Sequence, residues 1–140
     1  MLSRIAAVAM CCGAALAVGT SLAQELMANG FIGAFGAFAV GDKSALAYVN
    51  GRTLYTSEKD EPGKSNCAAA CTEAWPPALA GPGDRDFTVF TIITRADGAK
   101  QWAYKGKPLY LSIKDTVNGQ ANANGVDDQW YIVEIPAHEM

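Results

Sequence analysis

The stretch that decides the fold occurs twice, as GRTLYTSEKD at residues 51–60 and as GKPLYLSIKD at residues 106–115. Six of the ten positions are identical. At the same offset of 55, further identical pairs extend the match without a gap from about residue 35 to residue 80, and the clearest are Phe35 with Phe90, Asp42 with Asp97, and Trp75 with Trp130. A repeat of this length predicts an internal duplication, which dictates the symmetry of the fold.

The second copy shows the expected strand plan most clearly. Its first segment, FTVFTIIT, is rich in β-branched and aromatic residues, which favour a pleated strand. An Asp-Gly turn separates it from the alternating return strand KQWAYK. The strands are expected at residues 87–94, 100–105, 109–113 and 129–136, with weaker counterparts in the first copy at residues 36–40, 45–49 and 53–57.

Neither copy alone carries enough apolar sequence for a core of its own. We therefore expect a mainly β fold of about eight short strands, in which two tandem β-repeats form one small pseudo-two-fold sandwich or barrel. The repeats are expected at about residues 35–80 and 90–135, within a single domain that spans residues 35–136. Residues 24–34 have little pattern and are expected to be flexible.

The N-terminus has the features of an export signal. Arg4 supplies a positive charge, an apolar run follows from Ile5 to Val18, and Ser21-Leu22-Ala23 places small residues where a signal peptidase recognises them. We expect residues 1–23 to be a signal peptide, whose cleavage leaves 140 − 23 = 117 residues. The mature protein is then periplasmic or extracellular and has no membrane span. A retained N-terminal anchor is the alternative.

The cysteines divide into two pairs. Cys11 and Cys12 lie inside the signal, and the methionine before Cys11 disfavours lipidation there. The mature chain keeps Cys67 and Cys71, and two cysteines in an exported chain usually form a disulfide. Their spacing of four, on a short helical turn that ends at Pro76-Pro77, brings the Cα atoms within disulfide reach, at about 6 Å. A reactive dithiol is the alternative.

Composition argues against several classes of function. Without Arg4 the net charge is 10 − 14 = −4, which disfavours nucleic acids and anionic membrane surfaces. The single histidine, His138, lies near the C-terminus, so a His-based catalytic site has no good candidate, and zinc, copper and haem sites are disfavoured as well. The loop at residues 118–128 offers oxygen donors but fails the spacing of a helix–loop–helix calcium site. We expect no catalytic residue, no cofactor and no metal.

The repeated motif supplies the candidate site, a duplicated constellation of Tyr55, Asp60, Trp75, Tyr110, Asp115 and Trp130. In a strand, alternate side chains share a face, so Leu109, Leu111 and Ile113 are expected in the core and Tyr110 and Ser112 on the opposite face.

Three interpretations of this constellation remain open. The tyrosines can bury their rings while the aspartates fix the following loops, which is a purely architectural role. Alternatively, the six residues line a concave site that binds a ligand or a partner at the pseudo-two-fold axis. A third alternative is an acid pair, in which Asp60 and Asp115 meet and one pKa rises to create a general acid.

A resemblance to a known family follows from these motifs. The pattern G-x-x-L-Y-x-x-x-x-D at residues 51–60, the Cys-x-x-x-Cys turn with A-W-P-P, and F-x-x-I-T-R-x-D-G-x-K-Q-W-x-Y-K-G-x-P-L-Y at residues 90–110 resemble the bacterial "secreted repeat of unknown function" family. Its members are exported proteins or lipoproteins with a duplicated Tyr-x-aromatic-x-x-Asp motif. Here Ser57 and Ser112 stand in place of the usual aromatic residue. The resemblance implies an envelope location and a duplicated domain, and no established biochemistry.

We therefore expect an exported cell-envelope protein that is not an enzyme and that binds an envelope protein or a small ligand. The alternative is a redox or electron-transfer accessory, in which Cys67 and Cys71 cycle or a haem or copper is recruited.

Overall fold

The computed structural model describes residues 31–136, and the signal peptide expected at residues 1–23 lies outside this range. Residues 24–30 of the segment expected to be flexible also lie outside it, whereas Phe31–Ile32 forms the first strand. The described elements are β1 (Phe31–Ile32), β2 (Phe35–Val40), β3 (Lys43–Tyr48), β4 (Tyr55–Ser57), α2 (Cys71–Ala74), β5 (Phe90–Thr94), β6 (Lys100–Tyr104), β7 (Lys107–Pro108) and β8 (Trp130–Ile132).

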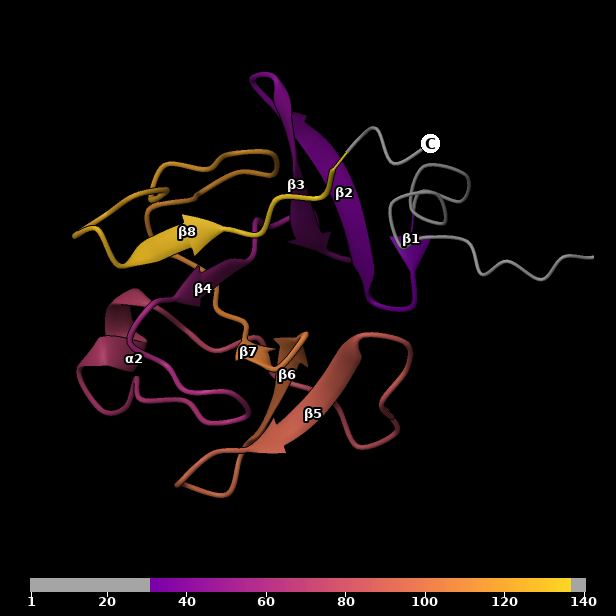
Figure 1. Cartoon of the computed structure of the whole chain (residues 1–140), viewed down its shortest axis with the longest axis vertical. Helices are drawn as coiled ribbons and strands as arrows, with labels where there is room; N and C mark the ends of the chain where they lie inside the picture. The colour runs from indigo at the N-terminus through magenta and orange to yellow at the C-terminus, as the bar shows by residue number, and fades with distance from the viewer. Residues whose placement is uncertain (1–30, 137–140) are drawn as a thin grey trace, which may run out of the picture.

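The strands form three small antiparallel sheets, ordered β1-β2-β3, β5-β6-β7 and β4-β8. Figure 1 shows the first two at opposite ends of the molecule, with β4 and β8 to one side between them. Strand β4 belongs to the first copy and β8 to the second, so this small sheet joins the two halves. The prediction of a mainly β fold built from two tandem repeats is confirmed, and the sheets stay open rather than closing into a barrel.

The two halves have equivalent hairpins, but their register differs from the expected one. Phe35 pairs with Tyr48, and Phe90 pairs with Tyr104, so β2 and β5 correspond at the offset of 55 whereas β3 and β6 correspond at an offset of 56. Between equivalent pairs, Ala39–Ser44 encloses four residues and Thr94–Lys100 encloses five, so the second hairpin has one extra residue. The following turn of the second copy is one residue shorter, since Gly106 follows Tyr104 after one residue and Gly51 follows Tyr48 after two. The ungapped repeat expected from the sequence is therefore wrong over β3 and β6. The offset of 55 returns at the glycine of the repeated motif.

The strand expected at residues 109–113 does not form. This segment runs beside residues 74–78, with hydrogen bonds from Leu111 N to Pro76 O at 2.7 Å and from Ile113 N to Ala74 O at 3.2 Å. Pro76 and Pro77 have no amide hydrogen to donate, so a regular ladder is impossible there. The expected alternation of faces fails with it, because Tyr110 is fully buried and Ile113 is 60% exposed.

Both hydrophobic clusters draw residues from both halves. In one cluster, Phe35 stacks on Phe90 with ring centroids 4.0 Å apart. In the other, Trp75 stacks on Trp130 with centroids 3.9 Å apart. Each stack joins residues that occupy equivalent places in the two copies, so the pseudo-two-fold axis passes through both. The copies thus share their cores, as the sequence predicted.

Candidate functional site

The two repeated tyrosines meet at the pseudo-two-fold axis. Tyr55 N donates to Tyr110 O at 2.8 Å, and Tyr110 N donates to Tyr55 O at 2.9 Å. This reciprocal pair is a single antiparallel bridge between the halves. It fixes the two phenol rings on opposite sides of the axis.

Each phenol donates to the carboxylate of the other copy. Tyr55 Oη donates to Asp115 Oδ2 at 2.6 Å, and Tyr110 Oη donates to Asp60 Oδ2 at 2.7 Å. The second oxygen of each carboxylate accepts a backbone N–H from the following loop, that of Asn122 for Asp115 (2.8 Å) and that of Asn66 for Asp60 (2.7 Å). The aspartates therefore fix these loops, as the architectural interpretation expects, and each bonds a tyrosine instead of joining an acid pair.

The two tryptophans complete the constellation. Tyr55 and Trp75 form a T-shaped contact with ring centroids 5.4 Å apart, and Tyr110 and Trp130 form the equivalent contact at 5.0 Å. Offset and edge-to-face contacts of this kind add to the stabilisation that area burial gives. The structure thus brings together all six residues that the sequence singled out.

Burial decides what this constellation does. Both tyrosines are fully buried, Asp115 and the two tryptophans are at most 7% exposed, and only Asp60 is half-buried. A concave binding site lined by these six side chains is therefore wrong as a description of the surface, because a ligand cannot reach five of them. Their packing points to the architectural role.

Burial also sets the protonation of these groups. It raises the pKa of Tyr110 to about 12 and the pKa of Tyr55 further, with a smaller contribution from the hydrogen bond to Asp115. Burial raises the pKa of Asp60 too, opposed by the hydrogen bonds from Asn66 and Tyr110 and by the charge of Arg95. The phenols consequently remain protonated donors at neutral pH, which suits structural hydrogen bonds rather than base catalysis.

The serines that replace the usual aromatic residue have a local role. Ser57 Oγ accepts the N–H of Lys59 at 3.2 Å, and Ser112 Oγ accepts the N–H of Lys114 at 3.1 Å. Such hydroxyl-to-backbone bonds start a turn directly after the strand position. The serines therefore shape the bend that carries each aspartate back to the tyrosine of the other copy.

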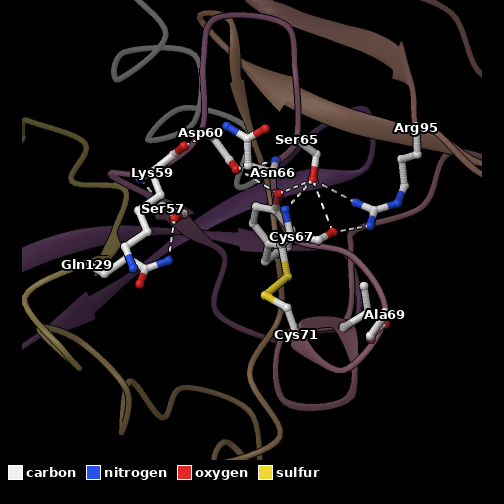
Figure 2. Close-up of a disulfide and its surroundings, with 12 residues drawn as sticks. Ser57, Lys59, Asp60, Ser65, Asn66, Cys67, Ala69, Cys71, Arg95 and Gln129 are labelled. Atoms are coloured by element: carbon white, nitrogen blue, oxygen red, sulfur yellow. Dashed lines mark hydrogen bonds between the residues drawn. A yellow bond between two sulfur atoms is a disulfide. The ribbon is translucent and has the colours of Figure 1, made fainter.

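The predicted disulfide between Cys67 and Cys71 is formed, with Cα atoms 5.3 Å apart, and the predicted helical turn is α2. Sequence reasoning missed its neighbour, Arg95, which is 8% exposed. Figure 2 shows the Arg95 guanidinium beside this loop, donating to Ser65 Oγ at 3.0 Å and to the Cys67 carbonyl. The available signal was the mismatch with the first copy, where Val40 stands at this place. The redox alternative for the cysteines stays a prediction.

Sequence reasoning also missed an exposed apolar surface. Four large apolar side chains are at least half exposed, and we call them the apolar face: Val49, Leu79, Ile113 and Val117. Val49 lies in the loop that joins Tyr48 to Arg52, and Ile113 lines the same hollow as Arg52. Tyr48 Oη donates to Leu79 O at 3.2 Å, and the segment after Val117 touches Gly51 through a backbone hydrogen bond from Gly119.

Comparisons with known proteins place the duplication in a family. A family model described as "secreted repeat of unknown function" matches residues 37–79 and again residues 91–134. Neither a curated protein nor a solved structure matches the chain. Between residues 31 and 136, no helix has the length and apolarity to cross a bilayer, and no three metal-ligating side chains of the His, Cys, Asp and Glu types cluster.

Proposed function

Since the chain belongs to a family of secreted repeats of unknown function, we propose that it is an exported, non-enzymatic module of the periplasm or cell exterior that binds a partner protein. The apolar face supplies the docking surface. The buried Tyr, Asp and Trp constellation holds the two halves in the geometry that presents this face.

A comparison within the molecule carries this proposal. At the offset of 55, Leu79, Ile113 and Val117 correspond to Glu134, Glu58 and Pro62, and Val49 lies in the loop that corresponds to the one at Lys105. The same backbone positions thus carry charge or proline on one side of the pseudo-two-fold axis and exposed apolar groups on the other. Folding does not require apolar side chains there. A partner that covers them accounts for their presence.

The shape of this face favours a protein over a small molecule. The hollow beside Ile113, which includes Arg52 and Pro76, has a volume of about 210 Å³. A neighbouring hollow beside Tyr48 has a volume of about 290 Å³. Both are smaller than the roughly 300–1,000 Å³ typical of pockets for drug-sized ligands. Shallow apolar relief with a polar rim is instead typical of protein interfaces.

Photocrosslinking in the native cell envelope tests this proposal. A photoreactive residue at Ile113 is expected to form an adduct that contains another protein, and the same residue at Glu58 is expected to form none. Glu58 is the matched control because it occupies the equivalent backbone position on the charged side. The additional change Val49→Glu is expected to abolish the Ile113 adduct.

The outcomes are distinct. An adduct that contains only a second copy of this chain would show self-association and overturn the assignment of a different partner protein. Equal adducts from the two positions, or no adduct from either, would remove the apolar face as a docking surface.

A further inference from the structure

The pocket beside the disulfide is a second candidate site, separate from the apolar face. It has a volume of about 280 Å³ and is lined by parts of the loop at residues 65–72 and by Arg95, Ala96 and Asp97. Its distinguishing feature is the Arg95 guanidinium, whose side chain is only 5% exposed.

The other half of the molecule shows this location without the charge. Strand register places Val40 where Arg95 lies and Ala45 where Gln101 lies. Both first-copy side chains pack into a hydrophobic cluster, and Ala45 is fully buried. The fold is therefore satisfied by small apolar groups at these positions. Burying an arginine there costs desolvation free energy that the architecture does not demand.

The protein accepts only some of the hydrogen bonds that the Arg95 guanidinium can donate. A guanidinium has five N–H groups in a planar fork. Nη1 donates to Ser65 Oγ at 3.0 Å and to Gln101 Oε1 at 2.7 Å, and Nη2 donates once, to the Cys67 carbonyl. Among residues 31–136, Nε and the second N–H of Nη2 have no acceptor within hydrogen-bonding distance.

These two uncommitted groups lie on one edge of the fork. Ser65 Oγ and the Cys67 carbonyl oxygen lie 3.4 Å apart. They therefore accept the two parallel N–H groups of Nη1 and Nη2 at the end of the guanidinium. The side edge, formed by Nε and Nη2, remains. This edge matches the two oxygens of a carboxylate, which arginine binds with a pair of parallel hydrogen bonds.

The charges around the pocket favour a single negative charge on the ligand. Asp97, which is 71% exposed on its side chain, has Oδ1 4.0 Å from Arg95 Nε. Asp60 reaches Arg95 only indirectly, because Tyr110 donates to Asp60 and is hydrogen-bonded to Ser65, which accepts from Arg95. One buried guanidinium compensates one negative charge, and a second charge on the ligand would lose hydration in the pocket without a partner, so a monoanion is favoured over a dianion.

We propose that this pocket binds a carboxylate, which the side edge of Arg95 holds in bidentate fashion. The carboxylate belongs either to a polypeptide, as an acidic side chain or C-terminus, or to a small organic acid. The ligand displaces water from the guanidinium edge and pushes the exposed Asp97 aside. The disulfide loop forms one wall and keeps the Cys67 carbonyl in place.

Amide NMR of the exported protein tests the proposal with sodium acetate as the probe. At constant ionic strength, acetate is expected to shift the amide signals of Ala68, Ala69 and Asp97 in a saturable manner. Acetamide, which has the same shape without charge, is expected to shift none of them. Phosphate is expected to bind more weakly, and a phosphate affinity equal to or above that of acetate would overturn the carboxylate assignment.

Paired variants separate binding from folding. Ala96→Glu places a competing carboxylate on the wall of the pocket and is expected to weaken acetate binding at least about ten-fold, whereas Ala96→Gln is expected to leave it within about two-fold. Arg95→Met is expected to abolish binding, and Arg85→Met, at an exposed arginine outside the pocket, is expected to retain it.

Equal loss in the Ala96→Glu and Ala96→Gln variants would show that the pocket does not select charge. That result would overturn the proposal even if the Arg95→Met variant fails to fold. A peptide that ends in a carboxylate, compared with its C-terminal amide, then distinguishes the two sources, because only a polypeptide ligand gains affinity beyond that of acetate.

Discussion

The two ends of the central hydrogen-bond network differ in what surrounds them. The Tyr55 oxygen accepts the backbone N–H of Ala123 at 3.4 Å in apolar surroundings. The equivalent Tyr110 oxygen meets Ser65, and through it the charged Arg95. The tyrosine–aspartate bond is the same in both halves, so it belongs to the architecture. The residues around each tyrosine hydroxyl differ between the copies, so a functional role is expected among these residues.

The largest effect is expected from a change that removes packing shared by the two halves. Trp130→Ala removes the stack on Trp75 and the edge contact with Tyr110, and it is expected to lower the free energy of unfolding by about 3–5 kcal/mol. Urea denaturation measures this loss. Val117→Ala, at an exposed position, serves as the control and should cost less than about 0.5 kcal/mol. A loss below about 1 kcal/mol in Trp130→Ala would mean that the stack does not join the halves.

A smaller effect distinguishes the two tyrosine–aspartate bonds. Asp115 is 5% exposed and Asp60 is half-buried, so water replaces the lost partner more easily at Asp60. Asp115→Asn is expected to cost about 2 kcal/mol and Asp60→Asn about 1 kcal/mol. Denaturant midpoints at neutral pH compare them. Equal costs would contradict the difference between the two ends of the network.

Removal of the disulfide tests whether the loop of the first copy needs a covalent link that the corresponding loop of the second copy lacks. Ala123 and Val126 pack into the corresponding side of the shared cluster without a covalent link. The double change Cys67→Ala and Cys71→Ala is therefore expected to leave a folded protein that is less stable by about 1–2 kcal/mol, because the loop closed by the bond is short. Thermal unfolding with and without reductant checks this. A variant that cannot fold would show that the two loops are not equivalent.

The smallest effect concerns pH and arises from Asp60. Burial raises the pKa of Asp60 above its ordinary value of 3.8, so the folded state holds the proton more tightly than the unfolded state does. The stability linked to this proton is fully present below pH about 3.8 and is lost as the pH rises through the folded-state pKa. Asp60→Asn is expected to remove this downward slope. Parallel profiles of unfolding free energy against pH for the two proteins would contradict it.

Much of the fold follows from the repeated decapeptide. Identical residues at one offset predict equivalent environments, and both aromatic stacks and the reciprocal tyrosines bear this out. The disulfide and its helical turn also follow, because the spacing of Cys67 and Cys71 is a local property. Patterns of this kind depend on neighbours in the chain or on direct comparison of the copies.

The failures have physical causes that lie elsewhere in the chain. The segment at residues 109–113 reads as a strand, but its neighbour contains Pro76 and Pro77, which prevent a ladder. The tyrosines read as candidates for a surface because alternation assigns one face to solvent. At a pseudo-two-fold axis, however, the second copy covers that face. Arg95 was overlooked because no single position reveals that its side chain is buried.

The exchange of aspartates between the halves makes each copy incomplete by itself. A polypeptide that contained one repeat would satisfy its tyrosine only by pairing with another such polypeptide, as in a homodimer. The chain is in effect that dimer fused into a single molecule. The same exchange allows two molecules to swap halves, so a domain-swapped dimer at high concentration would keep both tyrosine–aspartate hydrogen bonds. Cleavage of the chain near residue 84 would likewise leave two fragments that can reassociate.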